Sequence, residues 1–208
     1  MISENGQTEQ VIKDMAKKLI FQDGILKATT QQIADEAGVN RALIHYYFRS
    51  REQLLDTLLT EAITERRTRL REIFNAPNDS FKLKISKVLD LLMAHAADYP
   101  YLENFIVSEV AHQPDKVKVF CFKDKDKNDS IFRAQLQEEI EKGTLQPITK
   151  EHFMINLISM CHYPVLSKPI LQTIHGMSEP EYKRFMQERK RVIYRTIFNE
   201  DVPDTDHR

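Results

Sequence analysis

Residues 29–51 have the sequence TTQQIADEAGVNRALIHYYFRSR, and this stretch decides the fold. Thr29 and Gln32 have capping-box spacing, which predicts a helix that begins at Thr30 and stops at Gly38. Asn40 is a good N-cap for a second helix that runs to about Tyr47. Two short helices joined by a turn containing glycine are typical of a helix-turn-helix motif, in which a small residue lies where the helices cross. The residues expected to lock the pair together are Ile33, Ala34, Ala37, Gly38, Val39 and Ile44.

The exposed face of this predicted motif is basic. Residues 38–51 include three arginines, one histidine and two tyrosines, and no acidic residue. A helical hairpin that only packs would normally mix both signs of charge on its surface. Arg41, Ala42 and His45 share the outward face near the start of the second helix, the part of a recognition helix that meets base edges. The stretch therefore favours DNA binding over a purely structural hairpin.

The composition of the whole chain conceals this local charge. The 208 residues include 30 Lys+Arg and 31 Asp+Glu, a net charge of −1, which by itself does not indicate a nucleic-acid-binding protein. Only 5 glycines occur, about 2% against a typical 7%, and so few tight turns argue against a many-stranded β fold. At 41% hydrophobic residues, the chain has the composition of a soluble protein with a sizeable core.

Helical periodicity continues along the rest of the chain. We therefore expect an all-α protein of about nine helices. Residues 1–63 form a three-helix, helix-turn-helix domain, with its reading motif at about 29–51, and the last helix continues as a connecting helix to about residue 74. The polar run 75–80 contains Pro77 and is the best boundary. Residues 80–198 then form a larger helical domain, with a kink expected where Pro164 and Pro169 interrupt a helix, and residues 199–208 form a flexible tail.

The run from Gly24 to Leu55, with Tyr46-Tyr47-Phe48 followed by Ser50-Arg51, resembles the N-terminal domain of the TetR family of bacterial transcriptional regulators. The resemblance covers about residues 7–63. The remainder is similar only in being helical, in its length and in ending with two long helices. The resemblance implies a dimeric repressor on a palindromic operator in double-stranded DNA, released when the C-terminal domain binds a small-molecule effector that the sequence does not identify.

The resemblance also implies roles for individual residues. Arg41, Ala42 and His45 match positions that contact bases, and an arginine fork bonds O6 and N7 of guanine together. Ala42 and His45 depart from the family's more frequent glycine and tyrosine, which leaves the operator sequence open. The positions that match contacts to the DNA backbone are Thr29, Thr30, Tyr46, Tyr47 and Arg51.

Two consecutive helices over 149–198 are more broadly apolar than a single buried stripe requires. The plainer interpretation is intramolecular core, but a four-helix dimer interface explains the breadth better and agrees with the resemblance. The residues expected in that interface are Ile158, Leu166, Ile170, Phe185, Ile193 and Ile197. A ligand pocket between the helices of residues 81–175 is also expected, although core packing is an alternative for each residue: His95, Tyr99, Phe105, His112, Met160 and Tyr163.

Other classes of function find little support. No motif for a catalytic site or a phosphate loop occurs, and the histidines and two cysteines lack metal-ligand spacing, so we expect no enzyme, no metal and no cofactor. The most apolar stretch, residues 153–166, is too short to span a membrane. Without a signal-peptide pattern at its start, the chain is expected in the cytoplasm. The alternative is a helical protein–protein interaction module with no salt-dependent affinity for DNA.

Overall fold

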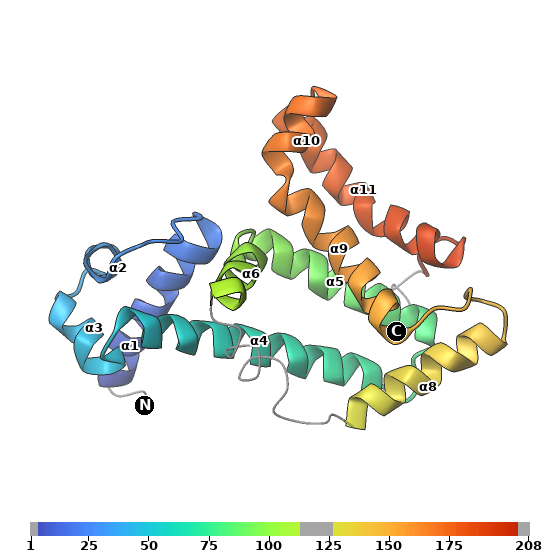
Figure 1. Cartoon of the computed structure of the whole chain (residues 1–208), viewed down its shortest axis with the longest axis horizontal. Coiled ribbons are helices and arrows are strands. Elements are labelled where there is room, and N and C mark those ends of the chain that lie inside the picture. Colours follow the sequence, from blue (N-terminus) through green and yellow to red (C-terminus); the bar gives the residue numbers. More distant parts are fainter. Residues whose placement is uncertain (1–3, 113–126, 204–208) are drawn as a thin grey trace. The chain divides into compact units, whose positions relative to one another are not determined.

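The computed structural model describes residues 4–112 and 127–203, which form ten α-helices and no strand within those ranges (Figure 1). The expectation of an all-α protein is confirmed. Residues 113–126, which include most of a stretch rich in charged residues (115–128), and the last five residues of the predicted tail lie outside the described residues.

The two helices of the motif and the connecting helix follow the predicted boundaries closely. α1 (Glu4–Lys17) passes into a π-helical turn, η1 (Lys18–Gln22), that buries Leu19, Ile20 and Phe21. α2 (Thr30–Ala37) and α3 (Arg41–Phe48) form the predicted pair of short helices. The long α4 (Arg51–Asn75) ends just before Pro77.

The later helices include the predicted kink. α5 (Phe81–Asp98), α6 (Leu102–His112) and α8 (Lys127–Glu141) precede α9 (Lys150–Leu166), α10 (Lys168–His175) and α11 (Glu179–Phe198). α9 and α10 replace one long helix, because Pro164 and Pro169 have no backbone N–H to donate. The break falls at Ser167, where the backbone leaves helical geometry.

The described residues divide into two compact units, 4–66 with 98–112 and 67–97 with 127–203. This differs from the predicted domains, which placed α6 with the C-terminal part. The N–H of Tyr101 donates to the carbonyl of Phe21 at 3.0 Å, and Phe105 packs against the Phe21 ring with centroids 5.6 Å apart. Periodicity shows that a helix has an apolar face but not which partner covers it, so the sequence could not place α6.

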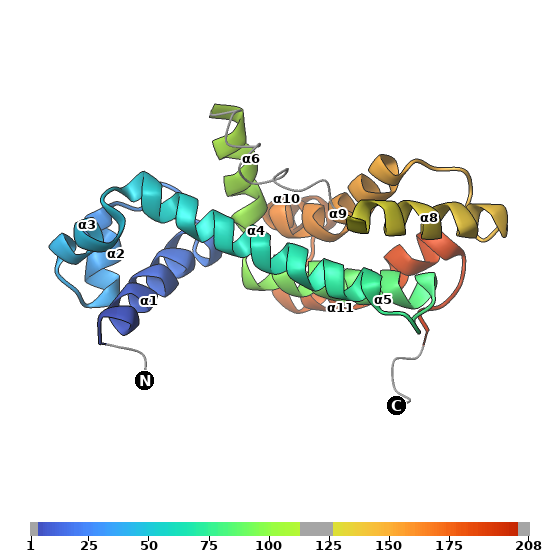
Figure 2. The same ribbon diagram turned by 90° about the horizontal axis from the view of Figure 1, so that it is seen from below.

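The second unit has an aromatic core. Phe132 of α8 packs against Phe74 of α4 and Phe81 of α5, with ring centroids 4.8 and 5.9 Å apart, and against Phe153 of α9 at 5.9 Å. Phe81 also meets Phe198 of α11. One group of rings thus joins five helices, and Figure 2 shows α8 beside the start of α9.

Candidate nucleic-acid interface

Side-chain and backbone caps set the two helices of the motif. At the start of α2, the N–H of Gln32 donates to Thr29 Oγ1 at 3.2 Å and the N–H of Thr29 donates to Gln32 Oε1 at 2.9 Å. Gly38 ends α2 in the left-handed conformation (φ 64°), which glycine adopts without steric cost. Asn40 Oδ1 then accepts from the N–H of Ala42 at 2.8 Å and begins α3. Local chemistry alone therefore builds this part of the site.

The predicted locking residues lie in or against the core of the first unit. Ile33, Ala34 and Ile44 are almost completely buried, and Ala37 and Val39 are partly buried against the same cluster. This packing leaves the opposite side of α3 toward solvent, where Arg41, Ala42 and His45 are all exposed.

Arg41 is held by a neighbouring helix. Its Nε donates to Thr30 Oγ1, at the start of α2, at 3.1 Å. Among the described residues its two terminal nitrogens make no further hydrogen bond or ion pair, so the end of the guanidinium stays available. A neutral acceptor orients the arginine without neutralising its charge.

The predicted backbone-contacting residues differ in exposure. Tyr46 is 68% exposed, and Tyr47 is half-buried with its ring centroid 5.1 Å from that of Tyr46. Thr29 is exposed and Thr30 is half-buried. These four residues and the three base-facing residues all belong to the first unit.

Arg51 has a different environment from the one the resemblance implies. Its Nε donates to the carbonyl of Ala28 at 2.6 Å and its Nη2 to the carbonyl of Leu26 at 2.7 Å. The guanidinium therefore ties the start of α4 to the loop that precedes α2. Two carbonyls more than twenty residues away leave no pattern in the sequence, so this contact could not be predicted.

Arg49 is a candidate that the sequence analysis did not include among the contacts. It has φ 62° and ψ −42°, and the N–H of Ser50 donates to the carbonyl of Phe48 at 2.6 Å across it. A tight turn of this kind is strained for a residue with a side chain. The side chain is exposed and unpaired among the described residues. The feature of the sequence that could have indicated Arg49 is its position within the basic residues 38–51.

The six residues expected to line a pocket are not brought together by the structure. Tyr99 and Phe105 pack around Phe21 in the first unit. His95 is half-buried on α5, while Tyr163 is 60% exposed on α9. Met160 alone among the five whose side chains are described lines a cavity of about 370 Å³ in the second unit. The side chain of His112 lies outside the described residues.

The residues expected at a dimer interface divide into exposed and core positions. Ile158, Leu166 and Ile170 are exposed, at 37%, 43% and 56%. Phe185 and Ile197 are half-buried. Ile193 is completely buried in its own unit, which corrects that expectation: the apolar faces of α11 are broad, and sequence could not tell which one turns inward. The exposed residues Ile155, Ile174 and Val192, which the prediction omitted, lie on the same three helices.

Cys161 lies in the core of the second unit. Burial raises the pKa of the Cys161 thiol to about 12, so it is a poor nucleophile near neutral pH. Within residues 4–112 and 127–203, no three histidine, cysteine or acidic side chains are grouped as a metal site would require. No helix in that part of the chain is long and apolar enough to cross a membrane.

Residues 12–58 match the family model of the bacterial regulatory proteins of the tetR family. The "Probable HTH-type transcriptional regulator YttP" of Bacillus subtilis is 23% identical over 91% of this chain and 95% of its own length. The "Nucleoid occlusion factor SlmA" of Vibrio cholerae is 23% identical over 92% of this chain and 90% of its own.

Solved structures show the same fold. A mutant of the HlyIIR protein with a substituted linker superimposes with a TM-score of 0.60 at 19% identity, over 95% of this chain and 100% of that one. The helix-turn-helix geometry and the match over residues 12–58 lead to one conclusion: this part of the chain is a DNA-binding domain of the type found in the tetR family of bacterial regulatory proteins.

Proposed function

We propose that this protein is a dimeric, ligand-responsive regulator of transcription that acts in the cytoplasm by binding rather than by catalysis. It represses from a palindromic operator and is released by a small-molecule effector. The observation that carries this proposal is the exposed face of α3, on which Arg41 is oriented by Thr30 and has a free guanidinium end.

The local electrostatics support DNA as the partner. Residues 38–51 contain three arginines and no acid, although the whole chain has a net charge of −1. The N-termini of α2 and α3 add partial positive charge where phosphates would lie. A footprint this small gives modest non-specific affinity. Tight operator binding then depends on two helix-turn-helix domains, one from each subunit, that bind the operator together.

A second copy of the chain is the proposed occupant of an apolar face on α9, α10 and α11. We call this the dimer face: Ile155, Ile158, Leu166, Ile170, Ile174 and Val192, each 37% to 71% exposed. Apolar side chains gathered on one surface mark an interaction site. A two-fold dimer uses the same patch on both subunits, and its symmetry matches that of a palindromic operator.

Effector release needs only a shift between populations. In one state the two helix-turn-helix domains are spaced to fit the operator, and in the other they are not. A ligand that binds better to the second state shifts the equilibrium away from operator binding. The size of that shift is limited by the difference in the ligand's affinity for the two states.

Titration of labelled DNA at several salt concentrations tests the proposed function. We expect the region flanking the protein's own gene to be bound more tightly than random duplex, and the logarithm of the affinity to fall linearly with the logarithm of salt concentration. A helical module for protein partners predicts no salt-dependent DNA affinity. That result would replace the proposal with the alternative.

The dimer face is tested by light scattering coupled to size exclusion. Ile170→Asp places a charge on the face and is expected to yield monomer where the wild type is dimeric. Val107→Asp is the matched control, because Val107 is 65% exposed on α6 and lies outside the dimer face. Dimers that persist in Ile170→Asp would place the interface elsewhere.

A further inference from the structure

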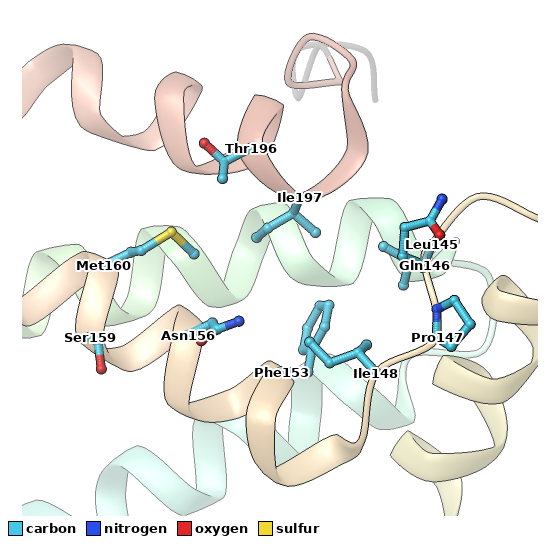
Figure 3. Close-up of a pocket in the computed structure, with 10 residues that line it drawn as sticks. All are labelled: Leu145, Gln146, Pro147, Ile148, Phe153, Asn156, Ser159, Met160, Thr196 and Ile197. Carbon is cyan, nitrogen blue, oxygen red and sulfur yellow. The ribbon is translucent and has the colours of Figure 1, made fainter.

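The second unit contains a cavity between α9, α11 and the connector from α8 to α9. Its volume is about 370 Å³, within the range of sites that hold small molecules. Figure 3 shows Phe153 and Met160 of α9 and Ile197 of α11 directed into the space between the two helices. Ile148 and Pro147 of the connector close one end.

The lining has no charge. All ten lining residues are apolar or carry neutral polar groups. A charged ligand would find no counter-ion among these residues, whereas an apolar one can bury surface against Phe153, Met160 and Ile197. The lining therefore favours an uncharged ligand over one that carries a carboxylate, phosphate or ammonium group.

One side chain supplies directional polarity. The Asn156 amide extends toward the centre of the cavity (Figure 3) and makes no hydrogen bond to another described residue. An amide offers both a donor and an acceptor. The Thr196 hydroxyl, by contrast, donates to the carbonyl of Val192 at 2.8 Å. Ser159 points away from the other lining side chains in the same view.

We propose that this cavity binds a small, uncharged, largely apolar molecule that hydrogen-bonds to the Asn156 amide. The inference rests on the proposed function in one respect, that such a molecule serves as the effector. The same two helices carry part of the dimer face: Asn156 follows Ile155 on α9, and Thr196 lies one turn beyond Val192 on α11. A molecule held between α9 and α11 therefore acts on the elements that meet the second copy, and its binding and dimerisation are linked reciprocally.

The test uses two fluorophores of the same skeleton. N-phenyl-1-naphthylamine is uncharged and has an N–H that the Asn156 oxygen can accept, whereas 1-anilinonaphthalene-8-sulfonate adds a negative charge. We expect one N-phenyl-1-naphthylamine per subunit, with the sulfonate binding at least about tenfold more weakly, a difference of about 1.4 kcal/mol. Equal affinity of the two dyes, or no binding of the uncharged one, would overturn the proposal.

Two threonines provide a matched pair of variants. Thr196 lines the cavity and Thr173 of α10 does not, yet both are exposed and both donate to the carbonyl four residues earlier at 2.8 Å. Thr196→Trp is expected to lower the affinity for N-phenyl-1-naphthylamine at least tenfold, while Thr173→Trp changes it less than twofold. Equal affinities for these two variants would place the dye elsewhere, including on the dimer face.

A third variant guards against misfolding, and a fourth separates this proposal from the proposed function. Asn156→Lys alters an exposed residue, so it is expected to fold and to weaken dye binding by charging the cavity. Arg41→Ala is expected to keep dye binding and to bind the operator more weakly. Normal dye binding in Asn156→Lys would contradict the cavity assignment. If the wild type failed to bind DNA, the dye result would stand, and only the proposed function as a regulator of transcription would be overturned.

Discussion

Arg41 Nε donates to Thr30 Oγ1 at 3.1 Å, so a residue expected to contact bases is positioned by one expected to contact phosphate. The bond joins the first residue of α3 to the first residue of α2. Because it uses only Nε, the terminal nitrogens keep the fork that guanine O6 and N7 require. The residue expected to contact bases and the residue expected to contact phosphate are therefore already linked in the protein without DNA.

The coupling predicts a graded effect of two substitutions. Arg41→Ala is expected to cost about 1–3 kcal/mol of discrimination, about 5- to 150-fold, on operator DNA and little on random DNA. Thr30→Val removes the hydroxyl but keeps the shape, so operator affinity falls by less and base preference is retained. Fluorescence anisotropy measures the affinity of each variant for operator DNA and for random DNA. Wild-type operator affinity in Thr30→Val would show that the bond has no positioning role.

Arg51 is expected to act on stability before it acts on DNA. Hydrogen bonds to charged groups contribute about 1.5–3 kcal/mol, so Arg51→Ala is expected to lower the free energy of unfolding by about that much, measured in urea. Arg51→Lys recovers only part, because an ammonium cannot span the carbonyls of Ala28 and Leu26 as a guanidinium does.

Arg49→Ala is the matched control for Arg51. It removes the same charge two residues away from a side chain that is exposed and unpaired among the described residues. We expect its stability to stay within about 0.5 kcal/mol of the wild type, while the salt slope of DNA binding falls by about one. An Arg51→Ala protein of wild-type stability with a flattened salt slope would restore the simpler phosphate-contact role.

Arg189 compensates for a proline. Pro164 has no N–H, so the carbonyl of Met160 lacks its helical donor, and Arg189 Nε on α11 donates to it at 3.1 Å. Pro164→Ala restores the missing donor. Arg189→Met is therefore expected to cost about 1.5–3 kcal/mol in the wild type and less than half of that in Pro164→Ala.

A double-mutant cycle measures this coupling. Tyr182→Phe is the control, since the Tyr182 hydroxyl donates to the carbonyl of Pro164 itself, at 3.0 Å, which the alanine retains. Tyr182→Phe should lower the free energy of unfolding by the same amount in the wild type and in Pro164→Ala. An Arg189→Met cost that does not depend on residue 164 would contradict the compensation.

The pKa of Cys161 predicts a pH dependence of thiol reactivity. Burial raises that pKa from the usual 9.0 to about 12, so between pH 7 and 8 the folded protein holds about a thousandfold less thiolate than an exposed cysteine. The two cysteines are Cys121 and Cys161, so Cys121→Ser isolates the second. Ellman's reagent should then react slowly in buffer up to about pH 10 and quickly in urea at pH 8. Fast reaction of the folded variant at pH 8 would contradict the burial.

Features that depend on near neighbours were predictable. The caps at Thr29 and Asn40 and the turn at Gly38 involve residues within a few positions, so the helices of the motif followed from the sequence. The kink after Pro164 followed from the chemistry of a single residue type.

Contacts between distant segments were not predictable. Arg51 meets carbonyls 23 and 25 residues away, and Arg189 meets one 29 residues away. Ile193 and Val192 are adjacent and equally apolar, yet one is completely buried and the other is 46% exposed. Only the packed structure decides between a core face and a surface that a second copy could cover.

Selection of bound sequences from a random DNA library, with the wild type and with Arg41→Ala in parallel, tests the central claim most directly. We predict that the wild type enriches an inverted repeat, and that Arg41→Ala loses the preference for one guanine at the equivalent position of each half-site while the rest of the motif persists. No enriched motif from the wild type, or the same motif from both proteins, would contradict the assignment of α3 as the element that reads DNA.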